Sequence, residues 1–373
     1  MKAVFTGYYG MQNAGDDAFL EVAAWGAQKY WGADESLFFS PSLPQLQHPA
    51  KNLHAFANYG HFAQALWEIA RAGIFASAGG STFHSPLHKT DLRTYAAWKK
   101  RLGLSGKAGA IGISLGPYSS AAGERSTVDY LQRLDFLALR DQASYDLACS
   151  YNLPYAPVRA FDLAALLPEV LGEVGKPALA GLNHRKIIGI SVCNYERYTG
   201  GEAARENKRN DFVEAVLLQL QQNEQLHFRF FIFNGHASMG DEELTRELIS
   251  KLAQQPGFSY EVVPYLANVA QTYRAVAECD LMFSTRLHAS IFACYAGVPF
   301  FLNEYHRKCA DFLEDVGQAA AYRLYDAQRS SGEVAQLFLE QLQPAVYQPP
   351  AHLAETRARA LLNFTATISP ISA

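Results

Sequence analysis

Short apolar runs alternate with helical segments along most of the chain, and this alternation limits the folds that are open to it. The first run, residues 3–6, leads into a glycine-rich turn over 7–15, and apolar residues then recur at helical spacing over 16–30. Continuous apolar runs that are separated by helices indicate parallel sheets covered on both faces. The sequence therefore predicts the α/β class, with doubly wound, Rossmann-like domains.

The pattern is interrupted once, over residues 168–185, where both periodicities are lost. We interpret this stretch as a linker between two domains, in keeping with a chain of 373 residues. The predicted division is a Rossmann-like domain over 1–168, a second one over 186–345, and a segment over 346–373 whose helix is a candidate to pack back on the first domain. Two such domains facing each other predict a cleft where their strands end.

Each half of the chain contains further runs of both kinds. In the first half the predicted strands cover residues 73–78, 109–115 and 135–139, and a helix is predicted over 143–149. In the second half the predicted strands cover 186–192, 228–233, 260–263, the residues around Leu281, and 298–302. Helices are predicted over 211–222, 242–253, 268–277, from Arg286 onward, and over 352–363.

Composition argues against several classes of function. The net charge is −4 and there is no long basic run, so binding to nucleic acid is not expected. The five cysteines are scattered without a C-x-x-C pair, which argues against a disulfide framework and a cysteine metal site. No apolar stretch approaches the roughly 18 residues of a membrane span, and no signal-like region precedes the first strand. We expect a cytoplasmic protein that holds no metal.

The strongest candidate site lies where an apolar run becomes a helix, at Ser284-Thr-Arg286-Leu-His288. A helix N-terminus favours anions, an arginine adds a planar fork for phosphate or carboxylate, and a histidine can move a proton near neutral pH. Residues two apart on a helix point about 200° apart, so Arg286 and His288 can share a ligand only if Arg286 lies at the helix mouth. The alternative makes Arg286 a salt-bridge partner and His288 a core histidine. Lys308 either returns to the same edge or is a solvated lysine at a helix start.

The glycine-rich turn after the first run is a second candidate. It contains Asn13, Gly15, Asp16 and Asp17, and it is not the G-x-G-x-x-G of dinucleotide-binding proteins. Glycine lets the backbone approach a ligand, and an asparagine side chain both donates and accepts hydrogen bonds. The alternative for the acids is a role as helix cap or first-turn residue.

Two more candidates follow buried strands in the first half. Gly79 and Gly80 end the 73–78 run, and their backbone amides could hold a phosphate or a sugar. The alternative is a tight turn followed by a Ser/Thr helix cap. Arg140 follows the 135–139 run, and it is either an anion clamp or the partner of a neighbouring acid.

Together these motifs resemble those of the polysaccharide pyruvyl transferase family. The resemblance is carried by residues 7–20, by the segments around Gly79-Gly80 and Arg140-Asp141, and by 284–291 with Lys308. The chain departs from the family in two places. The opening motif ends Gly-Asp-Asp where Gly-Asp-Glu is more usual, and 190–194 lacks an arginine that members often carry there, for which Arg197 is a poor substitute.

The resemblance implies a GT-B-like fold and transfer of pyruvate from phosphoenolpyruvate to a sugar of an exopolysaccharide or cell-wall glycan precursor, as a ketal. Phosphoenolpyruvate is then a substrate, no cofactor or metal is required, and the acceptor is a glycan or a lipid-linked oligosaccharide. A lipid-linked acceptor would bring the protein into contact with the inner face of the membrane.

It further implies that Arg286 and His288 are catalytic, with His288 as general acid. The residues implied to bind substrate are Asn13, Gly15, Asp17, Gly79, Gly80, Arg140, Ser284 and Lys308. In this reading the second domain binds the donor, and Asn13 and Asp17 act on the acceptor from the opposite domain. Two other functions stay open, a nucleotide-sugar-dependent glycosyltransferase and a non-catalytic sugar- or phosphate-binding protein.

Overall fold

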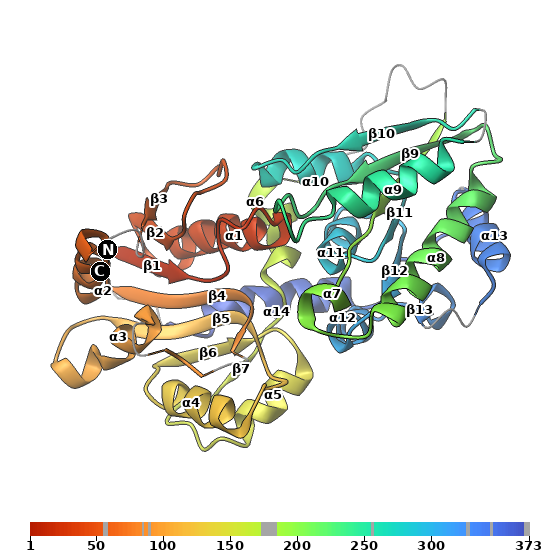
Figure 1. The fold of residues 1–373 in the computed structure, drawn as a ribbon. Coiled ribbons are helices and arrows are strands. Elements are labelled where there is room, and N and C mark those ends of the chain that lie inside the picture. The colour runs from red at the N-terminus through yellow and green to blue at the C-terminus, as the bar shows by residue number, and fades with distance from the viewer. Residues whose placement is uncertain are drawn as a thin grey trace. The chain divides into compact units, whose positions relative to one another are not determined.

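The computed structural model describes residues 1–54, 59–83, 86–88, 91–172, 185–254, 257–325, 329–343 and 346–368. The chain forms two compact units. The first consists of Met1–Gly10, Asp16–Val170 and Ala354–Ala373, and the second of Met11–Gly15 and Leu171–Leu353. Each unit has a sheet and a core of its own (Figure 1).

The first unit is built on a seven-stranded parallel sheet with the strand order β3-β2-β1-β4-β5-β6-β7. Its strands are β1 (Lys2–Thr6), β2 (Glu35–Phe39), β3 (Ala50–Leu53), β4 (Ile74–Phe83), β5 (Lys107–Leu115), β6 (Phe136–Leu139) and β7 (Val158–Arg159). Phe5, Phe75 and Leu137 on the central strands are fully buried. Strands β2 and β3 lie on one side of β1, and the chain then crosses to β4 on the other side of β1. The winding direction therefore reverses between β1 and β4.

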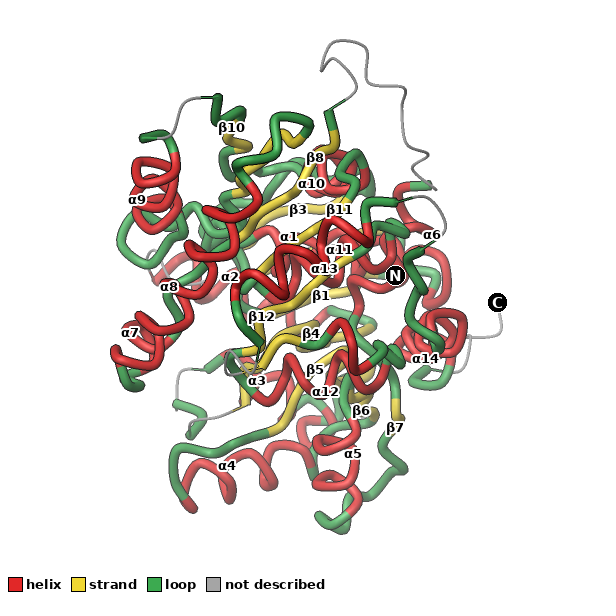
Figure 2. The backbone as a smooth tube through the Cα atoms, turned by 90° about the vertical axis from the view of Figure 1, so that its right-hand side faces the viewer, coloured by secondary structure: helices red, strands yellow, loops and turns green. Residues whose placement is uncertain are grey.

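Helices connect and cover these strands (Figure 2). They are α1 (Ala14–Trp31), α2 (Tyr59–Arg71), α3 (Leu92–Trp98), α4 (Ala121–Leu131), α5 (Gln142–Cys149), α6 (Leu167–Leu171) and α14 (Leu353–Thr365), with short 3₁₀ turns η1 (Lys100–Leu102) and η2 (Leu163–Leu166). The first turn of α1 carries Asp16 and Asp17, where the helix dipole favours negative charge. Asp141 caps α5 by accepting a hydrogen bond from the Ser144 amide at 2.8 Å.

The C-terminal helix α14 belongs to the first unit. Its Phe364 ring fills the space above Gly26, where any Cβ would overlap the ring. Trp31 donates from Nε1 to the Phe364 carbonyl at 3.0 Å, and the Gly112 amide donates to Oδ1 of Asn363 at 2.7 Å. The last described helix is therefore tied to both α1 and β5.

The second unit is built on a six-stranded parallel sheet with the order β10-β9-β8-β11-β12-β13. Its strands are β8 (Lys186–Ser191), β9 (Leu226–Phe231), β10 (Tyr260–Val263), β11 (Leu281–Ser284), β12 (Phe300–Glu304) and β13 (Leu324–Tyr325). Its helices are α7 (Glu196–Thr199), α8 (Ala203–Leu220), α9 (Glu242–Leu252), α10 (Val269–Ala277), α11 (Leu287–Tyr295), α12 (Arg307–Asp315), α13 (Ser331–Gln341) and the 3₁₀ turn η3 (Ala320–Tyr322). Phe338 of α13 packs its ring 4.4 Å from that of Phe301 and 5.0 Å from that of Phe283, which joins this helix to the sheet.

The predicted α/β class with two doubly wound sheets is confirmed. Two details of the prediction are wrong. Gly79-Gly80 does not end its strand, because β4 continues past the glycines to Phe83 and stays paired with β5. The predicted linker over 168–185 begins inside α6, where Pro168 and Val170 are buried, and its part over 173–184 lies outside the described residues.

Candidate functional site

The order of the strands locates a ligand-binding edge in the second unit. From β8 the chain moves outward to β9 and β10, and then returns to the other side of β8 as β11. In open α/β sheets, ligands bind at the carboxyl ends of the strands where this reversal occurs. Cys193, Asn194 and Tyr195 follow β8 there, and Thr285 and Arg286 follow β11. The motif that the sequence singled out therefore lies at the switch point.

Arg286 lies at the mouth of α11, as a shared role with His288 requires. It is the residue before the helix, with an extended backbone at φ −68° and ψ 120°. Hydrogen bonds of the buried Ser284 hydroxyl hold the start of α11 in place. Its Oγ donates to the Arg286 carbonyl at 3.1 Å and lies 2.8 Å from Oγ of Ser290. The buried Ser284 hydroxyl thus serves the local fold, which does not support the substrate-binding role predicted for it.

A buried carboxylate holds the Arg286 guanidinium. Nε lies 3.0 Å from both carboxylate oxygens of Asp241, and Nη2 donates to one of them. Asp241 is fully buried, and it also accepts from the Asn234 amide at 2.9 Å. Burial raises the pKa of Asp241, although the charge of Arg286 opposes this. Burial alone would lower the pKa of Arg286, but the Asp241 carboxylate outweighs it and the pKa is raised.

Arg286 is therefore a salt-bridge partner, as the alternative predicted. The salt bridge does not occupy the whole guanidinium group, so one edge of it can still contact a ligand. Nη1 takes part in neither of the bonds to Asp241, and one fifth of the side chain is exposed. A guanidinium held on one edge presents its other edge in a fixed direction, which suits bidentate recognition of an anion. Asp241 neutralises the pair as a whole, so net positive charge at this edge must come from other residues.

Lys308 supplies such a charge within a cluster of aromatic rings. Its Nζ lies 5.3 Å from the centre of the Tyr195 ring and 5.2 Å from that of Tyr305, and the two ring centres are 4.7 Å apart. Arg209 approaches the Tyr305 ring at 5.6 Å and is held by Glu196, with Nη1 donating to Oε1 at 2.8 Å. Aromatic faces attract cations in this arrangement and fix their position.

The pKa of the buried Cys193 thiol is influenced by all three of these cationic side chains. Burial raises its pKa to about 11, while Arg286, Arg209 and Lys308 all act on it electrostatically in the opposite direction. The thiol is therefore neutral near pH 7, and it is influenced by three cationic side chains from three different segments, of which Arg286 is paired with Asp241 and Arg209 with Glu196. We call Cys193, Tyr195, Arg209, Arg286, Tyr305 and Lys308 the switch-point cluster.

The opening turn packs against this part of the second unit. The Ala14 amide donates to the Phe233 carbonyl at 2.9 Å, and Asn13 forms an antiparallel bridge with Asn234. A Cβ on Gly15 would overlap the imidazole of His288, so the turn and the predicted general acid are in direct contact. The expectation that Asn13 acts from the opposite domain is therefore wrong, because backbone pairing after β9 joins residues 11–15 to the second unit.

The other predicted residues lie in the first unit. Gly79 has φ +75° and leaves no room for a Cβ because the Phe19 ring lies against it, whereas Gly80, at φ +81°, faces more open space beside Asp16. Asp17 is buried in the first turn of α1.

The ion-pair alternative is correct for Arg140. Nη1 donates to Asp162 at 3.0 Å, Nε to Ser114 at 2.7 Å, and Nη2 to Ser81 at 3.1 Å. A buried arginine with all three nitrogens engaged is a structural element of the first unit.

Sequence reasoning missed four residues that shape the site, namely Asp241, Arg209, Tyr195 and Glu196. Asp241 precedes α9 and resembles an ordinary helix-start acid, and its partner lies 45 residues away in the chain. In the described part of the chain, no three His, Cys, Asp or Glu side chains gather closely enough to hold a metal. Over the same residues, none of the helices combines the length and the apolar character needed to cross a membrane.

The fold resembles that of several solved structures. UDP-GlcNAc 2-epimerase from Methanocaldococcus jannaschii matches with a TM-score of 0.59 and 11% identity, over 96% of this chain and 98% of the other. The enzyme from Neisseria meningitidis bound to UDP-GlcNAc matches at 0.57 and 11%, over 97% and 100%. Anabaena Alr3699/HepE in complex with UDP and glucose matches at 0.55 and 13%, over 98% and 95%. At these identities the likeness defines the fold alone, and the fold is GT-B-like.

The family follows from a separate comparison. A model of the polysaccharide pyruvyl transferase family matches residues 13–307, which is most of the chain. The protein therefore belongs to this transferase family. No curated protein matches the chain.

Proposed function

We propose that this protein transfers pyruvate from phosphoenolpyruvate to a sugar of an exopolysaccharide or cell-wall glycan precursor, forming a ketal. The switch-point cluster beside the amino end of α11 is the observation that carries the proposal, since it brings Lys308 and the fixed Arg286 guanidinium to the carboxyl edge of the sheet. Membership of the family supports the same reaction. The acceptor is a free glycan or a lipid-linked oligosaccharide.

Phosphoenolpyruvate carries a phosphate and a carboxylate, and the cluster offers a different kind of group to each. Lys308 is a point charge positioned by two rings, which suits a phosphate. Arg286 presents one edge of a guanidinium whose other edge is fixed by Asp241, which suits a planar carboxylate. Arg140 takes no part in this proposal, because its three nitrogens are engaged within the first unit.

His288 is the proposed general acid. It protonates the methylene carbon of the donor, which leaves an oxocarbenium-like centre at the adjacent carbon. One sugar hydroxyl adds to this carbon, the bond to the phosphate oxygen breaks, and a second hydroxyl of the same sugar closes the ketal. One of the two hydroxyl protons restores the proton that His288 gave to the new methyl group, and the other leaves with the released phosphate.

Phosphate release tests this assignment. We expect His288→Gln to slow release by roughly 10²–10⁴-fold, as is typical for loss of an acid–base group, while the affinity for phosphoenolpyruvate changes little. Arg246→Gln is a matched control, because this exposed arginine on α9 pairs only with Glu242 among the contacts described. A His288 variant that retains full turnover contradicts the role of the acid, and the absence of phosphate release by the wild type favours a binding protein.

The solved structures favour one other candidate. Two of them contain UDP or a UDP-sugar on the same fold, so a nucleotide-sugar-dependent transferase also suits this architecture. Calorimetric titration with phosphoenolpyruvate and with UDP-glucose separates the two functions. Tighter binding of the nucleotide sugar replaces our proposal with this one.

A further inference from the structure

The loop between α3 and β5 in the first unit exposes large apolar side chains to solvent. Leu102 is 65% exposed, Leu104 39% and Trp98 37%. The loop ends where β5 begins at Lys107, so it lies at the edge of the sheet where the parallel strands start (Figure 1). Ligands of open α/β sheets bind at the opposite edge, so this surface is separate from the sites that the fold predicts for small molecules.

Hydrogen bonds hold this loop in a fixed shape. The buried Lys99 donates from Nζ to the Ala72 carbonyl at 2.5 Å, and the Leu104 amide donates to the Lys99 carbonyl at 3.0 Å. At the end of the loop, the Lys107 amide donates to the Gly73 carbonyl at 2.9 Å. The apolar side chains are therefore presented to solvent by a backbone that is tied to the end of α2 and to the start of β4.

Cationic side chains lie beside these apolar groups. Residues 98–107 contain four basic residues and no acidic one. Arg101 lies 4.8 Å from the centre of the Trp98 ring, and Arg133, which precedes β6, lies 5.7 Å from the same centre. Within the described part of the chain, Arg101, Lys107 and Arg133 form no ion pair. We call Trp98, Arg101, Leu102, Leu104, Lys107 and Arg133 the amino-edge patch.

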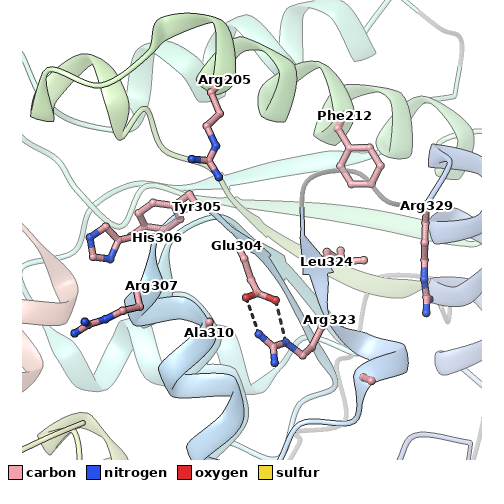
Figure 3. Close-up of a pocket in the computed structure, with 11 residues that line it drawn as sticks. Arg205, Phe212, Glu304, Tyr305, His306, Arg307, Ala310, Arg323, Leu324 and Arg329 are labelled. Atoms are coloured by element: carbon pink, nitrogen blue, oxygen red, sulfur yellow. Dashed lines mark hydrogen bonds and ion pairs between the residues drawn. The ribbon is translucent and has the colours of Figure 1, made fainter. Parts of the chain in front are cut away.

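Cations at other places in the structure are held by carboxylates. At the start of β1, Lys2 pairs with Glu35 at 3.3 Å and with Glu68 at 2.9 Å. In the pocket of the second unit that Figure 3 shows, Arg323 donates to both carboxylate oxygens of Glu304, at 3.1 and 2.9 Å. The amino-edge patch has no such compensation, and it is positive on a chain whose net charge is −4.

This combination of side chains fits the surface of an anionic membrane. Tryptophan prefers the level of the lipid headgroups, leucine inserts at the boundary with the acyl chains, and arginine and lysine are attracted by anionic headgroups. A nucleic acid or an acidic protein loop would pair with the cations and leave the leucines in water. A second copy of this chain, docked by the same patch, would bring like charges together.

We propose that the amino-edge patch docks the protein on a membrane surface that contains anionic lipid, with Leu102 and Leu104 inserted at the level of the headgroups. The inference concerns the first unit alone and does not depend on the proposed function. It also supplies a surface for the membrane contact that a lipid-linked acceptor would require.

Flotation of the full chain with lipid vesicles tests the inference. The probes are vesicles of phosphatidylcholine alone and vesicles of equal parts phosphatidylcholine and phosphatidylglycerol. We expect the anionic vesicles to bind at least roughly tenfold more tightly, because each cation near an anionic surface contributes about fivefold, and we expect high salt to weaken this binding. Equal binding to both kinds of vesicle, or binding to neither, overturns the inference.

Variants locate the binding. We expect Arg101→Gln and Leu102→Ser each to weaken binding to the anionic vesicles by roughly fivefold or more. The matched controls are Arg246→Gln and Val262→Ser, at exposed positions of the second unit, and they should bind as the wild type does. Thermal unfolding shows whether each variant is folded. If both folded patch variants bind as tightly as the wild type, the inference is wrong.

Sedimentation velocity tests the competing occupant of the patch. We expect a monomer that Leu102→Ser leaves unchanged. A dimer that separates in this variant would assign the patch to a second copy of the chain and would contradict docking on lipid. Release of phosphate from phosphoenolpyruvate is measured without vesicles, so it decides the proposed function independently of these results.

Discussion

Arg286 holds its guanidinium against a carboxylate that has no access to solvent. Removing one partner of a buried pair leaves an uncompensated charge, so Arg286→Gln should reduce the free energy of unfolding by about 3–5 kcal/mol at pH 7.5. The loss should depend on pH. Without its counter-charge, Asp241 has a pKa still further above that of the unfolded chain, and the folded state binds a proton that the unfolded state releases. The stability of the variant therefore falls as the pH rises above about 4.

Urea denaturation of the wild type and of Arg286→Gln at pH 5 and pH 7.5 checks this prediction. The double variant Asp241→Asn/Arg286→Gln is the control, because it has no buried charge and should recover much of the stability at pH 7.5. An Arg286→Gln variant that is equally destabilised at both pH values would show that lost packing, and not the orphaned carboxylate, dominates.

The positions and contacts of the site residues were only partly predictable from the sequence. The spacing of Arg286 and His288 required Arg286 to precede the helix, and the structure shows it there. Asp241 was not predictable, because its contact with Arg286 depends on tertiary structure and nothing distinguishes it locally from a first-turn acid. For Arg140, the sequence could not decide between clamp and ion pair, since Asp162 and Ser81 approach it only in the folded sheet.

At the level of elements, the start of α1 is packed against the side chain proposed for catalysis. Gly15→Ala would place a methyl group where the His288 ring lies. Since a displacement of a catalytic group by about 1 Å can cost 10²-fold in rate, we expect turnover to fall by roughly that factor. Steady-state kinetics with phosphoenolpyruvate and an acceptor measure the effect.

Gly332→Ala on α13 is the matched control for this substitution. A Cβ at Gly332 meets nothing within 4 Å, and its φ is not in the left-handed region. Alanine in a helix should therefore stabilise the protein by about 0.4–1 kcal/mol without a loss of turnover. If Gly15→Ala and Gly332→Ala have equal turnover, the contact between the opening turn and His288 has no role in the reaction.

Central strands were easier to predict than peripheral elements. The apolar runs that became β4, β5, β6 and β8 are buried on both faces and stand out in the sequence. The edge strand β3 has the sequence Ala-Lys-Asn-Leu and the edge strand β7 only two residues, so neither carries a recognisable pattern. A glycine pair normally marks the end of a strand, and β4 departs from this because its pairing with β5 resumes at Phe83.

For the molecule as a whole, α14 makes the first unit depend on the end of the chain. Phe364 packs against Trp31, with ring centres 5.3 Å apart, and against the backbone of Gly26. Phe364→Ala should cost about 3–5 kcal/mol, because a buried ring is replaced by a cavity. Thr365→Ala is the control at an exposed position of the same helix and should stay within about 0.5 kcal/mol.

Differential scanning calorimetry measures both substitutions. We expect Phe364→Ala to lower the transition of the first unit and to leave that of the second unit in place, since the residue has its contacts within the first unit. Equal transition temperatures for the two variants would mean that α14 contributes little to the first unit.

The return of α14 has a consequence for biosynthesis. A ribosome translates nearly all of the second unit, Leu171–Leu353, before the last part of the first unit, so the nascent second unit can fold while the first unit still lacks a helix. Until residues 354–368 have been translated, the apolar surface around Gly26 and Trp31 that Phe364 covers stays exposed to solvent. Newly made chains should therefore need chaperone protection at their amino-terminal half, and premature termination near the end should be more harmful than the small size of the missing segment suggests.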